Sequence, residues 1–111
     1  MVTNGTKRDF PAYSLDQVRV LARDLNVAIS AGVQNAIAGL GYQLEDVCKC
    51  LQVLEPSHFQ HSIWYENQNN WFDVYHLLYT SPDGYDDNLY IKLRLARACL
   101  LVSVISFHRQ R

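Results

Sequence analysis

The chain has 111 residues, 49% of them apolar, which is the size of one domain that buries about two-thirds of its unfolded surface. A formal net charge of −1 and a sequence pI near 6.4 argue against a strongly basic nucleic-acid binder, whose pI is usually above about 9. No apolar run reaches the roughly 18 residues of a membrane span and no secretion signal is present, so we expect a cytoplasmic protein with three reduced cysteines.

Three amphipathic helices are predicted in the first half of the chain. Ser14 and Gln17 form a capping box for the first helix, and Ser30 caps the second, which ends at Gly41. The third ends before Pro56. Apolar residues recur at spacings of three and four in each helix, as in Leu15, Val18, Leu21, Ala22 and Leu25, or Leu44, Val47, Cys48 and Leu51.

Four strands are predicted in the second half, because the apolar period changes to two. The stretches are "SIWYEN", "WFDVYHLLY", "LYIKLRL" and "CLLVSVISF", separated by short turns that favour antiparallel neighbours. The predicted fold class is therefore α+β, with about three N-terminal helices packed on one face of a C-terminal four-stranded antiparallel sheet. Residues 1–111 are expected to form a single domain, in which residues 1–10 are a loose tail.

Positive charge gathers at the end of the chain. The last 23 residues hold five lysines and arginines and no acid, whereas the first 88 residues are net acidic. In the stretch "LYIKLRL", strand alternation turns the leucines and the isoleucine to one face and Tyr90, Lys92 and Arg94 to the other. Apart from Ser103, the last stretch is apolar on both faces as far as Ser106, which predicts a strand in the interior of the sheet.

These cations suggest a site that holds a phosphate and moves a proton. Tyr90, Lys92, Arg94, His108 and Arg109 supply a phenol, an imidazole that titrates near neutral pH, and charges suited to a phosphorane-like transition state. The alternative is an ordinary solvated sheet face, on which basic side chains discourage edge pairing.

Histidines and aromatic residues admit two interpretations each. His58 and His61, three residues apart, suit either acid–base chemistry or a structural role, and the absence of a zinc motif predicts no metal and no cofactor. The aromatic residues suit either base stacking or the core. Alternation assigns Trp71 and Tyr75 to the core face, and Phe72 and His76 to the opposite face.

The order of these parts resembles one known family. The stretches "YSLDQVRVLA", "GLGYQLEDVCKCLQVLEPSHFQHS", "WFDVYHLLY", "LYIKLRL" and "VISFHRQR" together resemble the motility quorum-sensing regulator (MqsR) toxins of bacterial toxin–antitoxin systems. The likeness runs from about Tyr13 to His108. Its most specific pieces are W-x-D-V-Y at residues 71–75, Y-I-K-L at residues 90–93, and the S-F pair at residues 106–107.

The resemblance implies a fold like that of RelE-type ribonucleases and a sequence-selective mRNA endonuclease that cuts at GC-containing triplets. It also implies neutralisation by an antitoxin with a zinc-binding N-terminal domain and a DNA-binding C-terminal domain. No membrane partner, and no direct DNA binding by the toxin alone, is expected.

The family pattern places an active-site tyrosine at Tyr90, which matches. His61 and His108 occupy two positions where the family has lysine, and Phe72 occupies a position where it has glutamine. We therefore predict a metal-free mechanism in which His61, Tyr90 and His108 are catalytic. The predicted RNA-binding residues are Lys92, Arg94, Arg109 and Phe72.

Two other functions fit the sequence. The first is a degenerate toxin that engages an antitoxin without cleaving RNA. Phe72 and the low pI are the two features that favour this interpretation. The second is a small interaction module whose basic strands bind an acidic protein. A salt titration of RNA binding separates a phosphate-binding surface from such an interaction module, because binding driven by phosphate contacts weakens steeply as salt rises.

Overall fold

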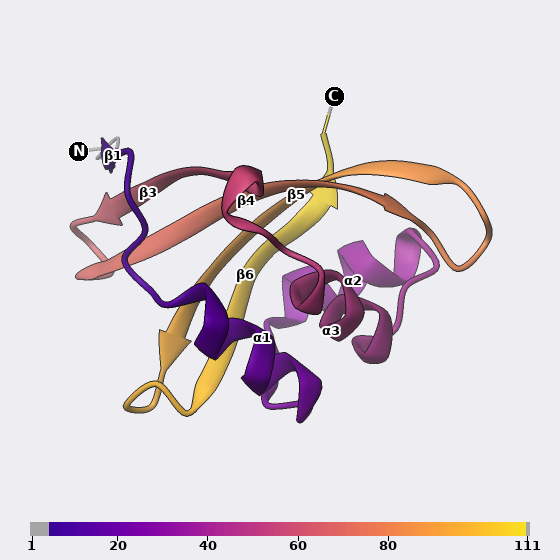
Figure 1. The fold of residues 1–111 in the computed structure, drawn as a ribbon, viewed down its shortest axis with the longest axis horizontal. Helices are drawn as coiled ribbons and strands as arrows, with labels where there is room; N and C mark the ends of the chain where they lie inside the picture. Colours follow the sequence, from indigo (N-terminus) through magenta and orange to yellow (C-terminus); the bar gives the residue numbers. More distant parts are fainter. Residues whose placement is uncertain (1–4, 111) are drawn as a thin grey trace.

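The computed structural model describes residues 5–110 and has an α+β fold, as predicted (Figure 1). Strands and helices alternate at the N-terminal end, and four longer strands follow. Their order is β1 (Thr6–Arg8), α1 (Leu15–Arg23), β2 (Val27–Ile29), α2 (Ala31–Gly39), α3 (Leu44–Gln52), a 3₁₀ turn η1 (Pro56–His58), β3 (Phe59–Tyr65), β4 (Asn70–Thr80), β5 (Asp86–Ala96) and β6 (Leu101–Arg109).

The sheet is wider than predicted. Strands β3 to β6 form the expected antiparallel series, but the full order is β1-β3-β4-β5-β6-β2. β1 pairs antiparallel with β3, so the expectation of a loose tail is wrong for Thr6–Arg8, and residues 1–4 lie outside the described residues. β2 runs parallel to β6, which makes the sheet mixed. The last strand is interior, as predicted, because it is paired on both sides.

The helices begin and end where the capping residues place them. The Ser14 hydroxyl accepts a hydrogen bond from the Gln17 N–H at 3.3 Å, and the Ser30 hydroxyl accepts one from the Val33 N–H at 3.4 Å. Gly41 has a φ of +80°, the left-handed conformation that suits a residue following a helix. All three predicted helices are confirmed.

All three helices pack on one face of the sheet, as predicted (Figure 1). The core between the layers includes Leu89, Ile91 and Leu93 of β5 and Tyr75 of β4, all 1% exposed or less. Along β5 these residues alternate with Tyr90, Lys92 and Arg94, which lie on the opposite sheet face. No helix of residues 5–110 packs on that face, which carries most of the side chains predicted for the site.

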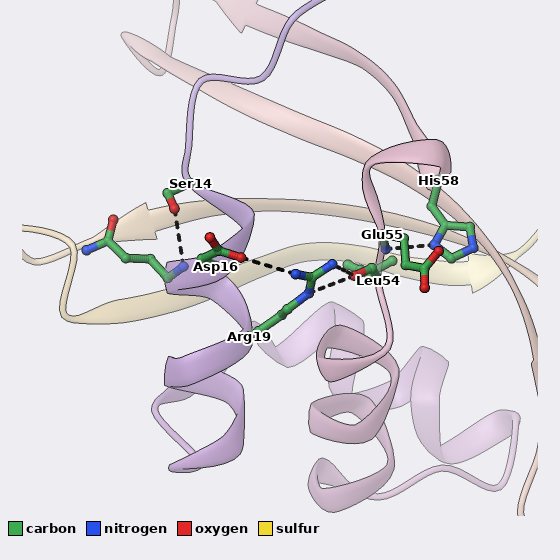
Figure 2. Close-up of polar contacts among 7 residues, drawn as sticks. Ser14, Asp16, Arg19, Leu54, Glu55 and His58 are labelled. Atoms are coloured by element: carbon green, nitrogen blue, oxygen red, sulfur yellow. Dashed lines mark hydrogen bonds and ion pairs between the residues drawn. The ribbon is translucent and has the colours of Figure 1, made fainter.

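Polar contacts join the helices to the segment that enters the sheet (Figure 2). The Arg19 guanidinium of α1 donates to the Leu54 carbonyl at 2.8 Å and pairs with Asp16 at 3.1 Å. The Glu55 N–H donates to His58 Nδ1 at 2.9 Å, which closes η1. His58 therefore has a structural contact at the helix side of the molecule.

Candidate functional site

The sheet face without helices carries a row of ionisable side chains that we call the open face. Register and alternation place on it Lys7 of β1, His61 of β3, His76 of β4, Tyr90, Lys92 and Arg94 of β5, and Ser106 and His108 of β6. Along β5, buried residues alternate with more exposed ones, as expected for a strand with one face in the core and one face open. The predicted facing of "LYIKLRL" is therefore confirmed.

The centre of the open face is a cross-strand row formed by His76, Tyr90 and His108. Tyr90 lies directly opposite His76 on one neighbouring strand and opposite His108 on the other. The Tyr90 ring centre is 5.7 Å from that of His76 and 4.8 Å from that of His108, and the planes of Tyr90 and His108 differ by only 10°. The phenol is thus flanked by two imidazoles.

His108 is held in a defined orientation. Its Nδ1 lies 2.9 Å from the Arg109 carbonyl oxygen, and because a carbonyl only accepts hydrogen bonds, Nδ1 carries the proton. In the neutral ring Nε2 is then the proton acceptor, and in the charged ring it is a second donor. The exposed His108 ring therefore presents Nε2 for exchange with a bound ligand.

Tyr90 is suited to donate a hydrogen bond. Burial raises the pKa of its phenol, and the nearby Lys92 ammonium lowers it to a smaller extent. A phenol with a raised pKa stays protonated at neutral pH. Its O–H can then bind an anionic oxygen above the sheet.

Lys92 and Arg94 contribute positive charge at different distances from this row. Lys92 Nζ donates to the Tyr65 hydroxyl at 2.9 Å and lies 4.8 Å from the centre of that ring, so its position is fixed. Arg94 is four residues from Tyr90, which is about 13 Å along a strand. Lys92 is therefore two residues from Tyr90 with its ammonium group held toward Tyr65 of β3, and Arg94 lies further along β5.

His61 is neutral at pH 7 and lies apart from His108. Its pKa is lowered by burial first and then by the charges of Lys7, His76 and Lys92. It lies opposite Val74, so three strand spacings, about 14 Å, separate it from β6. The structure brings His61 near His76 and does not bring it near His108.

Arg109 does not lie on the open face, which corrects its predicted role in RNA binding. It is the neighbour of His108 in a strand, so its side chain points to the opposite side. Its guanidinium pairs with the Asp87 carboxylate at 2.7 Å, and Asp87, 3% exposed, also accepts a 2.9 Å bond from the Tyr42 hydroxyl. Arg109 therefore neutralises a buried carboxylate.

Phe72 lies on the predicted face. Its side chain is only 1% exposed, so it is too buried to make the predicted contact with RNA. It packs with Ile63 and Val74, and its ring centre is 5.6 Å from that of Tyr65. Phe72 thus forms part of an apolar layer beneath the polar side chains. Phe72 is therefore a hydrophobic support for Tyr65.

The two aromatic residues assigned to the core have different surroundings. Tyr75 is buried against the helices, as predicted. Trp71 is only half-buried: the Arg8 guanidinium carbon lies 3.8 Å from its ring centre, and Trp64 packs beside it at 5.6 Å. The prediction for Trp71 was therefore wrong, because at this end of the sheet β1 and not a helix covers it.

His76 is the site residue that sequence reasoning missed. Alternation already placed it on the face away from the core, but nothing in the sequence gave its register. Only strand pairing shows that it lies opposite Tyr90. Burial lowers the pKa of His76, so it too is neutral at pH 7.

Replacing Phe72 with alanine tests its supporting role. A Phe72→Ala variant is expected to lower the free energy of unfolding by about 3–5 kcal/mol, because the removed ring leaves a cavity beneath Tyr65. Urea denaturation measures this, with Tyr85→Ala as the exposed control. A loss below about 1 kcal/mol contradicts the assignment.

NMR titration of the histidine rings tests the electrostatics of the open face. The midpoints of His61 and His76 are expected below the ordinary value of about 6.5. Lys7→Met removes one of the charges that act on His61 and is expected to raise the His61 midpoint without restoring it fully, since burial is the larger cause. A His61 midpoint above 6.5 in the unaltered protein contradicts this assignment.

Other site types find little support within residues 5–110. No cluster of three or more histidine, cysteine, aspartate or glutamate side chains is arranged to hold a metal ion. Within the same residues no helix is long and apolar enough to cross a membrane.

Comparison with known proteins identifies the family. Residues 10–109 match the model of the family described as motility quorum-sensing regulator, toxin of MqsA. No curated protein matches the chain. Since the matched segment covers nearly the whole chain, the protein belongs to the MqsR toxin family, which makes it a toxin of a toxin–antitoxin system with an antitoxin as its partner.

Proposed function

We propose that the protein is a metal-independent, sequence-selective mRNA endoribonuclease that inhibits translation and growth. The observation that carries the proposal is the row on the open face, where a protonated phenol lies between two imidazoles, with the Lys92 ammonium group held on the same face by Tyr65. These are the groups that phosphodiester cleavage without a metal requires: proton carriers, a hydrogen-bond donor to phosphate, and a cation.

The chemistry restricts the substrate to RNA. A base removes the proton of a ribose 2′-hydroxyl, the oxygen attacks the adjacent phosphorus, and an acid protonates the departing 5′-oxygen. DNA lacks the attacking hydroxyl and cannot react in this way. In this scheme Tyr90 donates to a phosphate oxygen, Lys92 stabilises the charge that develops there, and His108 is one of the two proton carriers.

His61 and Arg94 extend the proposed RNA contact beyond the reacting phosphate. His61 lies three strands from His108, and Arg94 lies toward the β6 turn, so we propose that each contacts a neighbouring nucleotide. Family membership supports cleavage at GC-containing triplets. It also supports an antitoxin with a zinc-binding N-terminal domain and a DNA-binding C-terminal domain.

Mapping cuts in a defined mRNA tests this function. Purified protein in EDTA is expected to cut at a recurring triplet, read by primer extension. His108→Ala is expected to lower the cleavage rate by roughly 10²- to 10⁴-fold, because a positioned proton carrier is lost. His58→Ala, which alters a histidine of η1 outside the open face, is the matched control and should cleave normally.

Two results contradict the proposal in different ways. Unchanged cleavage by folded His108→Ala removes this residue from the mechanism. No cleavage by folded unaltered protein at any site contradicts the nuclease itself and favours the toxin-like binding protein that engages an antitoxin without cutting RNA. Retention of cuts at a position where the mRNA carries a 2′-deoxyribose contradicts attack by the 2′-hydroxyl.

A further inference from the structure

The spacing of the histidines decides which two act on one phosphate. In an in-line displacement the base and acid nitrogens lie at most roughly 9 Å apart, which is the straight-line sum of two hydrogen bonds of about 2.8 Å and the two apical bonds to phosphorus. His61 and His108 are separated by about 14 Å across three strands and by two further residues along them, about 16 Å in all. Lys92 and Tyr65 bridge a comparable backbone separation with longer side chains, whereas two imidazoles reach less far above the sheet.

His76 lies nearer to His108 than His61 does. The two residues are level with each other across Tyr90 and two strand spacings apart, which is about 10 Å. Tyr90 fills the space between them, with ring centres at 5.7 Å from His76 and 4.8 Å from His108. A phosphate that accepts a bond from the Tyr90 hydroxyl therefore has one imidazole on each side.

We propose that His76 is a catalytic residue and forms the acid–base pair with His108 across Tyr90. This inference rests on the proposed ribonuclease function and deepens it by assigning the second proton carrier. It also places the scissile phosphate above Tyr90, with the RNA backbone crossing from β4 to β6.

The surroundings of the two rings suggest the direction of proton transfer. Burial lowers the pKa of His76, which favours the neutral ring that a base requires. The His108 Nδ1–H donates to the Arg109 carbonyl, which leaves Nε2 as the nitrogen that can hand a proton to the leaving oxygen. His76 takes the proton of the 2′-hydroxyl as the bond from that oxygen to phosphorus forms. The bond from phosphorus to the 5′-oxygen breaks, and His108 protonates that oxygen. The products are a 2′,3′-cyclic phosphate and a 5′-hydroxyl.

A pair made of His61 and His76 is less suitable, although these two residues are close enough. Burial lowers the pKa of both, so both favour the neutral state, which suits a base better than an acid. Tyr90 also does not lie between His61 and His76, because His61 is on β3, on the other side of β4 from Tyr90. Loss of His61 should therefore cost less activity than loss of His76.

Single-turnover cleavage of a short RNA containing one mapped cut site tests the assignment. His76→Ala and His108→Ala are each expected to reduce the rate by roughly 10²- to 10⁴-fold, and His61→Ala by less than about tenfold. His76→Gln keeps a polar side chain of similar size and should be equally slow if proton transfer is what is lost. Thermal denaturation of each variant checks that it is folded.

An RNA with sulfur in place of the 5′-oxygen at the cut site separates base from acid. A thiolate leaves without protonation, so His108→Ala should regain most of its lost rate on this substrate, whereas His76→Ala should remain slow. Near-normal cleavage by folded His76→Gln overturns the inference, as does recovery of the His76 variants on the sulfur substrate. If the unaltered protein cuts neither RNA, the proposed nuclease function fails, and this inference fails with it.

Discussion

The two-residue alternation of β5 is the constraint on which the rest of the structure depends. Leu89, Ile91 and Leu93 are fully buried against the helices, and each of them fixes the side on which its polar neighbours lie. A shift of the strand by one residue would bury Tyr90 and Lys92 in the core and expose the leucines. The free energy of core burial thus holds the functional face in register.

A second set of contacts holds the strands next to β5. The Asp87 carboxylate accepts hydrogen bonds from Tyr42 and from Arg109, which fixes the end of β6 where His108 lies. Beneath the open face, Phe72 supports Tyr65, whose hydroxyl in turn holds the Lys92 ammonium group. Residues that do not reach the surface therefore determine where the charged groups lie on it.

Much of this arrangement is readable in the sequence, and the failures have physical causes. Helix caps and strand alternation are local, so three helices, four strands and the facing of Tyr90 were predicted correctly. β1 and β2 were missed because each is three residues long, too short for a period to show, and pairs with a distant strand. The prediction that Arg109 binds RNA failed for a different reason. Strand alternation already puts Arg109 on the opposite face from its neighbour His108, so the sequence itself argued against that prediction. The position of His76 opposite Tyr90 required the register of β4 against β5, which no local pattern contains.

We propose that RNA is cleaved above Tyr90 on the open face of the sheet. A crystal structure of the protein with a short RNA that carries a 2′-deoxyribose at the mapped cut site, and so cannot react, would locate the bound substrate. The scissile phosphate is expected within hydrogen-bonding reach of the Tyr90 hydroxyl, with the rings of His76 and His108 on either side. A phosphate bound instead beside His61 and Lys7, or on the helix-covered side of the sheet, would contradict it.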